Sequence, residues 1–344
     1  MASTQRRTGR PRVPSIGDVA ALAGVSAQTV SRVSTGSPSV RPATRERVLK
    51  AMTELGYTPN RAARALRVGT VESIGIVTQR LSRTGDGVTA AAVATAAQER
   101  GYSVSLVEVP EPDPEELRKA THRLSNTALD GLVMVRAGHT TADALPLPPS
   151  LPVVVADSRL AGHYPSVVCN EAHGTEDAVT HLLGLGHRTV HHIAGSPDAH
   201  PATVRMATWR RRLAAAGIAA PEPLIGDWTP NSGYELGRTL AEDPSVTAVF
   251  CANDEMAFGL IRALHEAGLS VPDDVSVVGI DDIPLSEFSH PPLTTVSLDY
   301  ERLGRELVRV LAEQLSGHAG PTIPRVVLPT KLLVRASTGP PPTR

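Results

Sequence analysis

The sequence predicts an all-α helix-turn-helix head followed by an α/β body of two lobes, each built on a doubly wound parallel sheet. Three observations predict this fold class. Residues 15–56 place apolar side chains at helical spacing between helix-capping residues. From residue 71, short apolar runs alternate with helical segments, which is typical of βαβ units. The chain of 344 residues also exceeds one ordinary domain.

Three short helices are expected in the head. The first opens at Ser15, where Asp18 completes a capping box, and it ends at a glycine turn. A second helix covers about residues 26–33. A third runs over about 42–55 and stops at Gly56. Two short helices joined by a glycine turn and braced by a third form a helix-turn-helix.

The second helix carries residues suited to reading DNA. In a helix-turn-helix, the exposed N-terminal half of this helix meets base edges in the major groove. Gln28 can pair with adenine, and Arg32 can bind guanine through two parallel bonds. Phosphate oxygens, which fix register without reading sequence, suit the polar residues Ser26, Thr29, Ser31, Arg41 and Thr44.

The charge is divided unevenly along the chain. Residues 1–70 contain twelve Lys and Arg against three acidic residues, whereas the remainder contains 22 against 32. A basic head on an acidic body indicates that the head alone binds a polyanion, which a plain three-helix bundle with polar faces would not explain. Residues 1–14 are basic and interrupted by two prolines, so we expect a disordered arm. Its Gly9–Arg12 stretch resembles a minor-groove hook, although a plain flexible tail is the favoured interpretation.

The head also resembles a known DNA-binding domain. SIGDVAALAGVSAQTVSRV and VRPATRERVLKAMTELGYTPNRAARALR are similar to the head of the LacI/GalR family of bacterial repressors. The resemblance places a head at residues 15–59 and a hinge helix with its linker at 60–70. It implies that Leu66 wedges into the central minor-groove step, with Arg64 and Arg67 on the flanking phosphates. It further implies DNA contacts from Ser15, Ala27, Tyr57, Asn60 and Ala63.

The body alternates predicted strands and helices. Strands are expected at 74–77, 104–107, 131–135, 153–156, 189–193, 246–251 and 275–280. Helices are expected at 88–100, 176–185, 202–216 and 255–267. Ligands of such sheets bind at the carboxyl ends of the strands, which for two lobes means the cleft between them.

The body resembles the periplasmic-binding-protein-like core of the same family. HLLGLGHRTVHHIAG, CANDEMAFGLIRALHEAGLSVPDDVSVVGIDD and PPLTTVSLDYERLG match it. By this likeness the lobes interleave. Lobe 1 would span about 71–169 and 298–327, lobe 2 about 170–296 and 328–338, and a tail would follow at 339–344.

Polar residues that follow strands are the candidates for the cleft. A carboxylate, an amide and a guanidinium converging there would suit vicinal hydroxyls, and a tryptophan would offer a flat face to a sugar ring. Arg205 is expected to open a helix after a strand, whereas Asp254 and Asp282 are interpreted as helix caps. The resemblance implies effector contacts from Asp157, Arg205, Trp228, Asn253 and Asp281, with Tyr300 near a crossing between the lobes.

One departure from the family pattern concerns the effector. After the first strand of the body the family often has an Asn-Pro-aromatic stretch, whereas this chain has TQRLSRTGDGVTAA. Effector identity therefore cannot be taken from a relative. A saccharide is the first expectation, and a purine or another metabolite is the second.

The composition limits the function classes. Apolar residues make up 41% and charged residues 20% of the chain, with a mean hydropathy of −0.07 and no run of 18 apolar residues. No apolar stretch follows the N-terminal arginines, so we expect no secretory signal. Cys169 and Cys251 lie in apolar runs and are expected to be reduced core residues of a cytoplasmic protein that holds no metal or cofactor.

The resemblance implies a transcriptional repressor that binds a pseudo-palindromic operator as a homodimer and joins the nucleoid when bound to DNA. Closure of the lobes around an effector would switch operator affinity, with the sign left open. Pro340–Pro342 follow the last family stretch without a heptad helix, so dimers are expected rather than tetramers. No catalytic motif stands out, and we expect no enzyme. A secreted sugar-binding protein is the alternative, against which the basic head argues.

Overall fold

The structure is a computed structural model that describes residues 14–34, 37–57, 71–110, 115–116, 119–120, 124, 129–136, 147, 150–156, 159–318 and 322–343. The chain divides into two compact units, residues 1–71 and 72–344. We treat these as the head and the body. The predicted basic arm up to residue 13, the predicted hinge-helix residues Asn60, Ala63, Arg64, Leu66 and Arg67, and the cleft candidate Asp157 lie outside the described residues.

The described residues of the head form three helices, α1 (Ile16–Ala23), α2 (Ala27–Ser34) and α3 (Pro42–Leu55). The predicted capping box is present: Asp18 donates its backbone N–H to Ser15 Oγ at 3.3 Å, and the backbone N–H of Ser15 donates to Asp18 Oδ2 at 2.7 Å. Gly56 ends α3 in the left-handed conformation, with φ of 63°. The helices enclose a small core of Val19, Ala20, Ala23, Val30, Val33, Val48, Ala51 and Met52.

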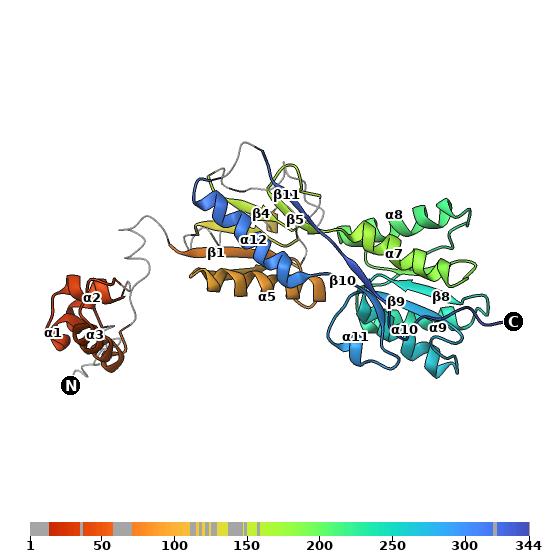
Figure 1. The fold of residues 1–344 in the computed structure, drawn as a ribbon, viewed down its shortest axis with the longest axis horizontal. Coiled ribbons are helices and arrows are strands. Elements are labelled where there is room, and N and C mark those ends of the chain that lie inside the picture. Colours follow the sequence, from red (N-terminus) through yellow and green to blue (C-terminus); the bar gives the residue numbers. More distant parts are fainter. Residues whose placement is uncertain are drawn as a thin grey trace, which may run out of the picture. The chain divides into compact units, whose positions relative to one another are not determined.

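The first sheet of the body, with its helices, is called lobe 1 below. Its strands are β1 (Ser73–Thr78), β2 (Ser103–Glu108), β3 (Gly131–Met134), β4 (Val153–Val155), β5 (Ser166–Cys169) and β11 (Arg325–Leu328), in the order β11-β5-β4-β3-β1-β2. All pairings between these described strands are parallel. Helices α5 (Thr84–Glu99) and α12 (Tyr300–Leu315) pack on it (Figure 1) and share one buried apolar cluster with Ile74 and Val133.

The second sheet and its helices form lobe 2. Its strands are β6 (His191–Ala194), β7 (Leu224–Ile225), β8 (Ala248–Cys251), β9 (Ser276–Asp281), β10 (Thr294–Ser297) and β12 (Lys331–Leu333), in the order β12-β10-β9-β8-β6-β7. Only β12 runs antiparallel to its neighbour among these described strands. Buried clusters on both faces involve α7 (Glu171–Gly184) and α8 (His200–Ala215), or α9 (Pro230–Ala241) and α10 (Asp254–Glu266). A short helix, α11, covers Leu285–Phe288.

The chain passes between the lobes three times. It leaves lobe 1 after β5, returns from β10 to α12, and leaves again between β11 and β12 (Figure 1). The carboxyl ends of β5, β10 and β11 therefore meet between the two sheets. This arrangement brings the strand ends of both lobes to one place.

The predicted strands of the body are all present with ends shifted by up to two residues. The described part of the body holds five further strands that were not predicted: β5, β7, β10, β11 and β12. Helix α5 begins four residues before its predicted start at residue 88. Gly85 and Gly87 lie in the first turn of this helix. A Cβ at Gly87 would stand 2.5 Å from the Leu81 carbonyl oxygen, and one at Gly85 would stand 3.2 Å from the Tyr300 hydroxyl, so both positions leave little room for a side chain. Among the described residues, no helix is both long enough and apolar enough to cross a membrane.

Candidate functional site

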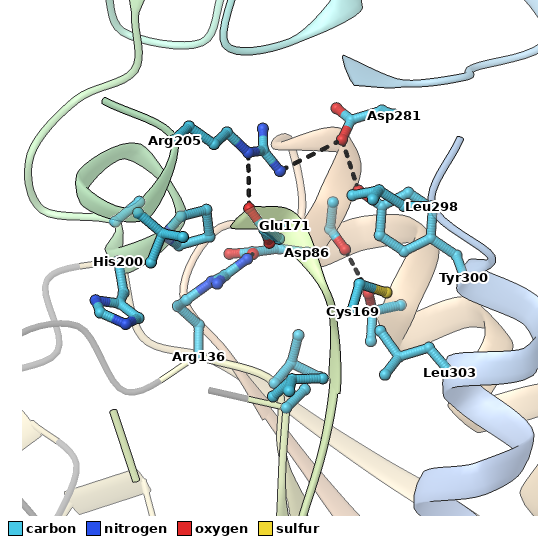
Figure 2. Close-up of a pocket in the computed structure, with 18 of the residues that line it drawn as sticks. Asp86, Arg136, Cys169, Glu171, His200, Arg205, Asp281, Leu298, Tyr300 and Leu303 are labelled. Carbon is cyan, nitrogen blue, oxygen red and sulfur yellow. Dashed lines mark hydrogen bonds and ion pairs between the residues drawn. The ribbon is translucent and has the colours of Figure 1, made fainter. Parts of the chain in front are cut away.

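A cavity of about 330 Å³ lies where the strand ends of the two lobes meet (Figure 2). Lobe 1 contributes the segment after β1, the start of α5 and the residue pair after β3. Lobe 2 contributes the loop after β6, the second turn of α8 and the ends of β8 and β9. The volume is at the small end of ligand sites in proteins, which suits a ligand of one or two rings.

Five of the six effector candidates predicted from the sequence line this one cavity, namely Arg205, Trp228, Asn253, Asp281 and Tyr300. The sixth, Asp157, lies outside the described residues. Residues almost a hundred positions apart are thus brought together by the parallel sheets. The position of Arg205 differs from expectation, because α8 begins at His200 and Arg205 lies in the second turn rather than at its opening.

Arg205 is the centre of the charge arrangement in lobe 2. Its guanidinium is buried, with 3% of the residue exposed. Nε donates to Glu171 Oε2 at 2.7 Å, Nη2 lies 3.9 Å from Asp281 Oδ1, and Nη1 donates to the carbonyl of Ala252. Figure 2 shows the three charged side chains converging on the cavity. A buried guanidinium balanced in this way stays in place and presents its remaining N–H groups in a fixed direction.

Asp281 forms the second half of this arrangement. It accepts a hydrogen bond of 2.7 Å from the hydroxyl of Tyr300, the first residue of α12. Burial raises the pKa of Asp281 to about 7, although the nearby Arg205 opposes the rise. Burial likewise raises the pKa of Tyr300. Near neutral pH, Asp281 can therefore accept or donate a hydrogen bond to a ligand hydroxyl.

Asn253 and Trp228 depend on each other. Asn253 is the N-cap of α10, where its Oδ1 accepts from the N–H of Met256 at 3.0 Å. Its Nδ2 donates to the backbone carbonyl of Trp228 at 3.0 Å and to Glu255 Oε2 at 3.1 Å. Since both amide hydrogens are used within the protein, Asn253 acts on the cavity mainly by holding Trp228, whose ring centroid lies 5.7 Å from the Arg205 guanidinium carbon.

The wall from lobe 1 contains residues that the sequence analysis missed. Asp86 in the first turn of α5 is 2% exposed and accepts from Arg136 Nε at 3.1 Å and from the N–H of Arg80 at 3.2 Å. Arg83 and Thr84 lie beside it. In lobe 2, Glu171 was missed as well. All of them follow the carboxyl ends of β1, β3 or β5, so the rule that found Asn253 and Asp281 would have found them had it been applied to these strands.

Two neighbouring acids are not the helix caps that the sequence suggested. Asp254 is fully buried and accepts hydrogen bonds from Ser286 Oγ at 2.6 Å, Thr295 Oγ1 at 2.5 Å and the N–H of Ile283 at 3.0 Å. Burial raises its pKa to about 6 despite these bonds. Asp282 instead pairs with Arg335 at 2.7 Å. Both hold lobe 2 together, because α10 itself is capped by Asn253.

The described residues contain no group of three or more His, Cys, Asp and Glu that could hold a metal ion. Cys169 lines the cavity, where burial raises the pKa of its thiol to about 12. A thiol with so high a pKa is a poor nucleophile. Cys251 is fully buried.

The head presents its predicted recognition residues to solvent. Gln28 and Arg32 are exposed on α2, whereas Val30 and Val33 of the same helix are buried. Ser26 caps α2, its Oγ accepting from the N–H of Thr29 at 3.2 Å. Of the other predicted DNA contacts, Ser15, Ala27 and Arg41 are exposed and Thr29, Ser31, Thr44 and Tyr57 are half-buried.

Two family models match the chain. Residues 15–60 match the model of bacterial regulatory proteins of the lacI family, and residues 179–338 match the periplasmic binding protein-like domain. The chain is 35% identical to the HTH-type transcriptional regulator CelR of Thermobifida fusca, covering 95% of this chain and 99% of that protein. It is 34% identical to the HTH-type transcriptional repressor PurR of Haemophilus influenzae, covering 88% of this chain and 91% of that protein.

Solved structures agree with these matches. A crystal structure of the lac repressor dimer bound to operator and the anti-inducer ONPF has a TM-score of 0.82 at 33% identity and covers 95% of this chain and 100% of that one. A transcriptional regulator CelR–cellobiose complex has a TM-score of 0.70 at 34% identity, covering 94% and 99%. The chain therefore belongs to the lacI family of bacterial regulatory proteins, with the helix-turn-helix head and the two-sheet periplasmic-binding-protein-like body expected from its sequence.

Proposed function

We propose that this regulator represses transcription by binding a pseudo-palindromic operator through α2, and that a saccharide bound in the cavity between the lobes switches its operator affinity. The observation that carries the proposal is the convergence of Arg205, Trp228 and Asp281 on one cavity of a chain whose head exposes Gln28 and Arg32. A DNA-reading face and a ligand cavity in one chain suit an allosteric regulator.

The balance of charges in the cavity supports a neutral, hydroxyl-rich effector. Arg205 is matched by Glu171 and Asp281, and Arg136 is matched by Asp86. Such pairs leave little net charge to attract an ion, while their remaining donors and acceptors suit neighbouring hydroxyls. The face of Trp228 can stack on a sugar ring. A CelR–cellobiose complex among the solved relatives supports this class, and a purine stays the alternative effector.

The exposed and half-buried residues of the head are the proposed operator contacts. We propose base contacts from Gln28 and Arg32, and backbone contacts or close packing from Ser15, Ser26, Ala27, Thr29, Ser31, Arg41, Thr44 and Tyr57. For the hinge, the family resemblance alone supports contacts from Asn60, Ala63, Arg64, Leu66 and Arg67. Asp157 likewise stays a proposed effector contact on the resemblance.

A second copy of the chain is the proposed partner. Leu285 and Phe288 of α11 are 55% and 79% exposed, an apolar pair that a monomer would leave in water. The dimeric state of the lac repressor in its operator complex supports a dimer. As a DNA-binding regulator the protein would act in the cytoplasm, associated with the nucleoid when bound, and without catalytic activity.

The proposal is tested by measuring operator binding with and without effector. Duplexes selected from a random pool by the purified protein provide the operator, and a thermal-shift screen of neutral saccharides and purines identifies the effector, because a ligand raises stability by RT ln(1 + [L]/Kd). We expect a saccharide to raise the melting temperature and to change operator affinity.

The variant Arg205→Ala should abolish the response to the effector while operator affinity without effector stays the same. A purine that produced the thermal shift would replace the saccharide assignment. No salt-sensitive binding to any duplex, with or without these compounds, would overturn the assignment as a repressor.

A further inference from the structure

Gly195, the residue that follows β6, lies directly against the indole of Trp228. A Cβ built on Gly195 would stand 2.5 Å from Trp228 Cε2 and closer still to Cζ2 and Cη2, so it would overlap the six-membered ring. The backbone of Gly195 does not itself require glycine, because its φ lies outside the left-handed region. The position therefore needs glycine for space.

The indole is also fixed from its other sides. Trp228 has a φ of 77°, a left-handed conformation that bulky residues rarely adopt. Its carbonyl is held by Asn253 Nδ2, and its ring lies beside the Arg205 guanidinium. The residue is 9% exposed. With the backbone held and the ring confined between Gly195 and Arg205, the indole cannot yield to a larger residue without leaving its position.

We propose that Gly195 is a positioning residue for effector binding, which lets the indole of Trp228 form part of the cavity wall beside Arg205. A side chain at position 195 would push the ring either into the cavity or away from the guanidinium. The role of Gly195 in effector binding rests on the proposed effector site. The packing part stands on the contact between Gly195 and Trp228 alone.

The variant Gly195→Ala tests the packing in the full-length protein without any ligand. Trp228 emission and its quenching by iodide report on the ring, while Trp209 gives a constant background, since it is fully buried and donates its Nε1–H to the Val190 carbonyl at 2.9 Å. We expect a red shift and stronger quenching in Gly195→Ala. Gly184→Ala is the matched control, because a Cβ at this exposed end of α7 meets nothing within 4 Å. An emission spectrum identical to wild type in Gly195→Ala would overturn the proposal.

Melting temperatures distinguish a contact with Trp228 from a general loss of stability in Gly195→Ala. Its melting temperature should fall by about 2–4 °C or more, as for other overpacked sites. In a Trp228→Phe background the fall should shrink, because phenylalanine lacks the second ring that the new methyl group would overlap. An undiminished loss in that background would contradict the inference. Neither measurement uses an effector, so a failure of the effector proposal would be seen separately, as a wild-type protein that binds no saccharide.

Discussion

The guanidinium of Arg83 lies 2.9 Å from the carboxylate of Asp198, and this ion pair joins the two lobes beside the cavity, which Arg83 lines. Gln79 of lobe 1 donates to the same carboxylate at 3.0 Å, and Thr84 donates to Glu255 of lobe 2 at 2.5 Å. Hydrogen bonds from Ser196, Arg83 and Gln79 lower the pKa of Asp198 despite its burial, which alone would raise it. Protein side chains thus hold the lobes together without a ligand.

Removing the charge of Asp198 should weaken effector binding. Asp198→Asn keeps the size of the side chain but loses the ion pair, whose two side chains are 13% and 30% exposed. The effector would then have to hold the lobes together itself, at a cost of about 0.5–1 kcal/mol, so its dissociation constant should rise by roughly two- to fivefold. Titration calorimetry at low and high salt measures this. The control is Glu266→Gln, which breaks an exposed ion pair within α10. Equal affinities in wild type and Asp198→Asn would show that the bridge does not contribute to closure.

The raised pKa of Asp281 should make the stability of the protein depend on pH. Its pKa is about 7 in the folded protein compared with an ordinary value of 3.8, so between these values the folded state binds more protons than the unfolded state. This group alone therefore makes the free energy of unfolding fall as the pH rises from about 4 to about 7, with no further change above. Buried His192, whose pKa burial lowers to about 4, acts in the opposite direction over part of this range.

The contribution of Asp281 is isolated by comparing wild type with Asp281→Asn, which retains an acceptor for the Tyr300 hydroxyl. Urea unfolding from pH 4 to 8 gives the free energy of unfolding of each protein as a function of pH. The slopes of the two plots should differ by up to about 1.4 kcal/mol per pH unit, which corresponds to one proton. Parallel curves would mean that Asp281 is charged throughout this range.

Phe288 provides a test of the dimer. With 79% of its surface exposed on α11, its apolar ring gains most by burial against a second copy. Phe288→Asp should shift the sedimentation mass from two chains toward one, because a charged group would have to be buried in the interface. Val334→Asp serves as the control, since Val334 is 58% exposed elsewhere in lobe 2. A mass of four chains in the wild type would contradict the dimer assignment.

The sequence patterns found most of the fold because its signals are local. The capping box at Ser15 and the left-handed glycine after residue 55 define helix ends by short-range geometry, and both are present. Strand β7 was missed because two residues carry no periodicity, and β11 because its exposed edge position leaves only Leu328 fully buried. These strands depend on pairing with distant partners rather than on their own sequence.

The candidate site likewise contains residues that local sequence signals reveal and residues that they do not. Asp281 follows a strand whose apolar run is plain in the sequence, so it could be predicted. Glu171 follows β5, a short apolar run that was not assigned as a strand, and Asp86 lies ahead of the helix start predicted at residue 88. That Asp86 pairs with Arg136, fifty residues away, is a consequence of β1 and β3 being neighbours in the sheet, which only the tertiary structure reveals.

Arg32 and Arg41 of the head should contact different parts of the operator, the base edges and the backbone. Arg32 is exposed on α2, where its two parallel donors can meet a guanine edge, whereas Arg41 is exposed at the N-terminus of α3 and suits a phosphate. Arg32→Ala should lose about 1–3 kcal/mol on the selected operator and little on variants with one guanine replaced. Arg41→Ala should weaken binding to all duplexes alike. It should also make the plot of log affinity against log salt concentration less steep by about one, because one counterion fewer is released. Fluorescence anisotropy with operator and single-base variants at several salt concentrations distinguishes the two outcomes. If Arg32→Ala lost affinity uniformly across sequences, Arg32 would be a phosphate contact, and sequence reading would rest on Gln28 and its neighbours on α2.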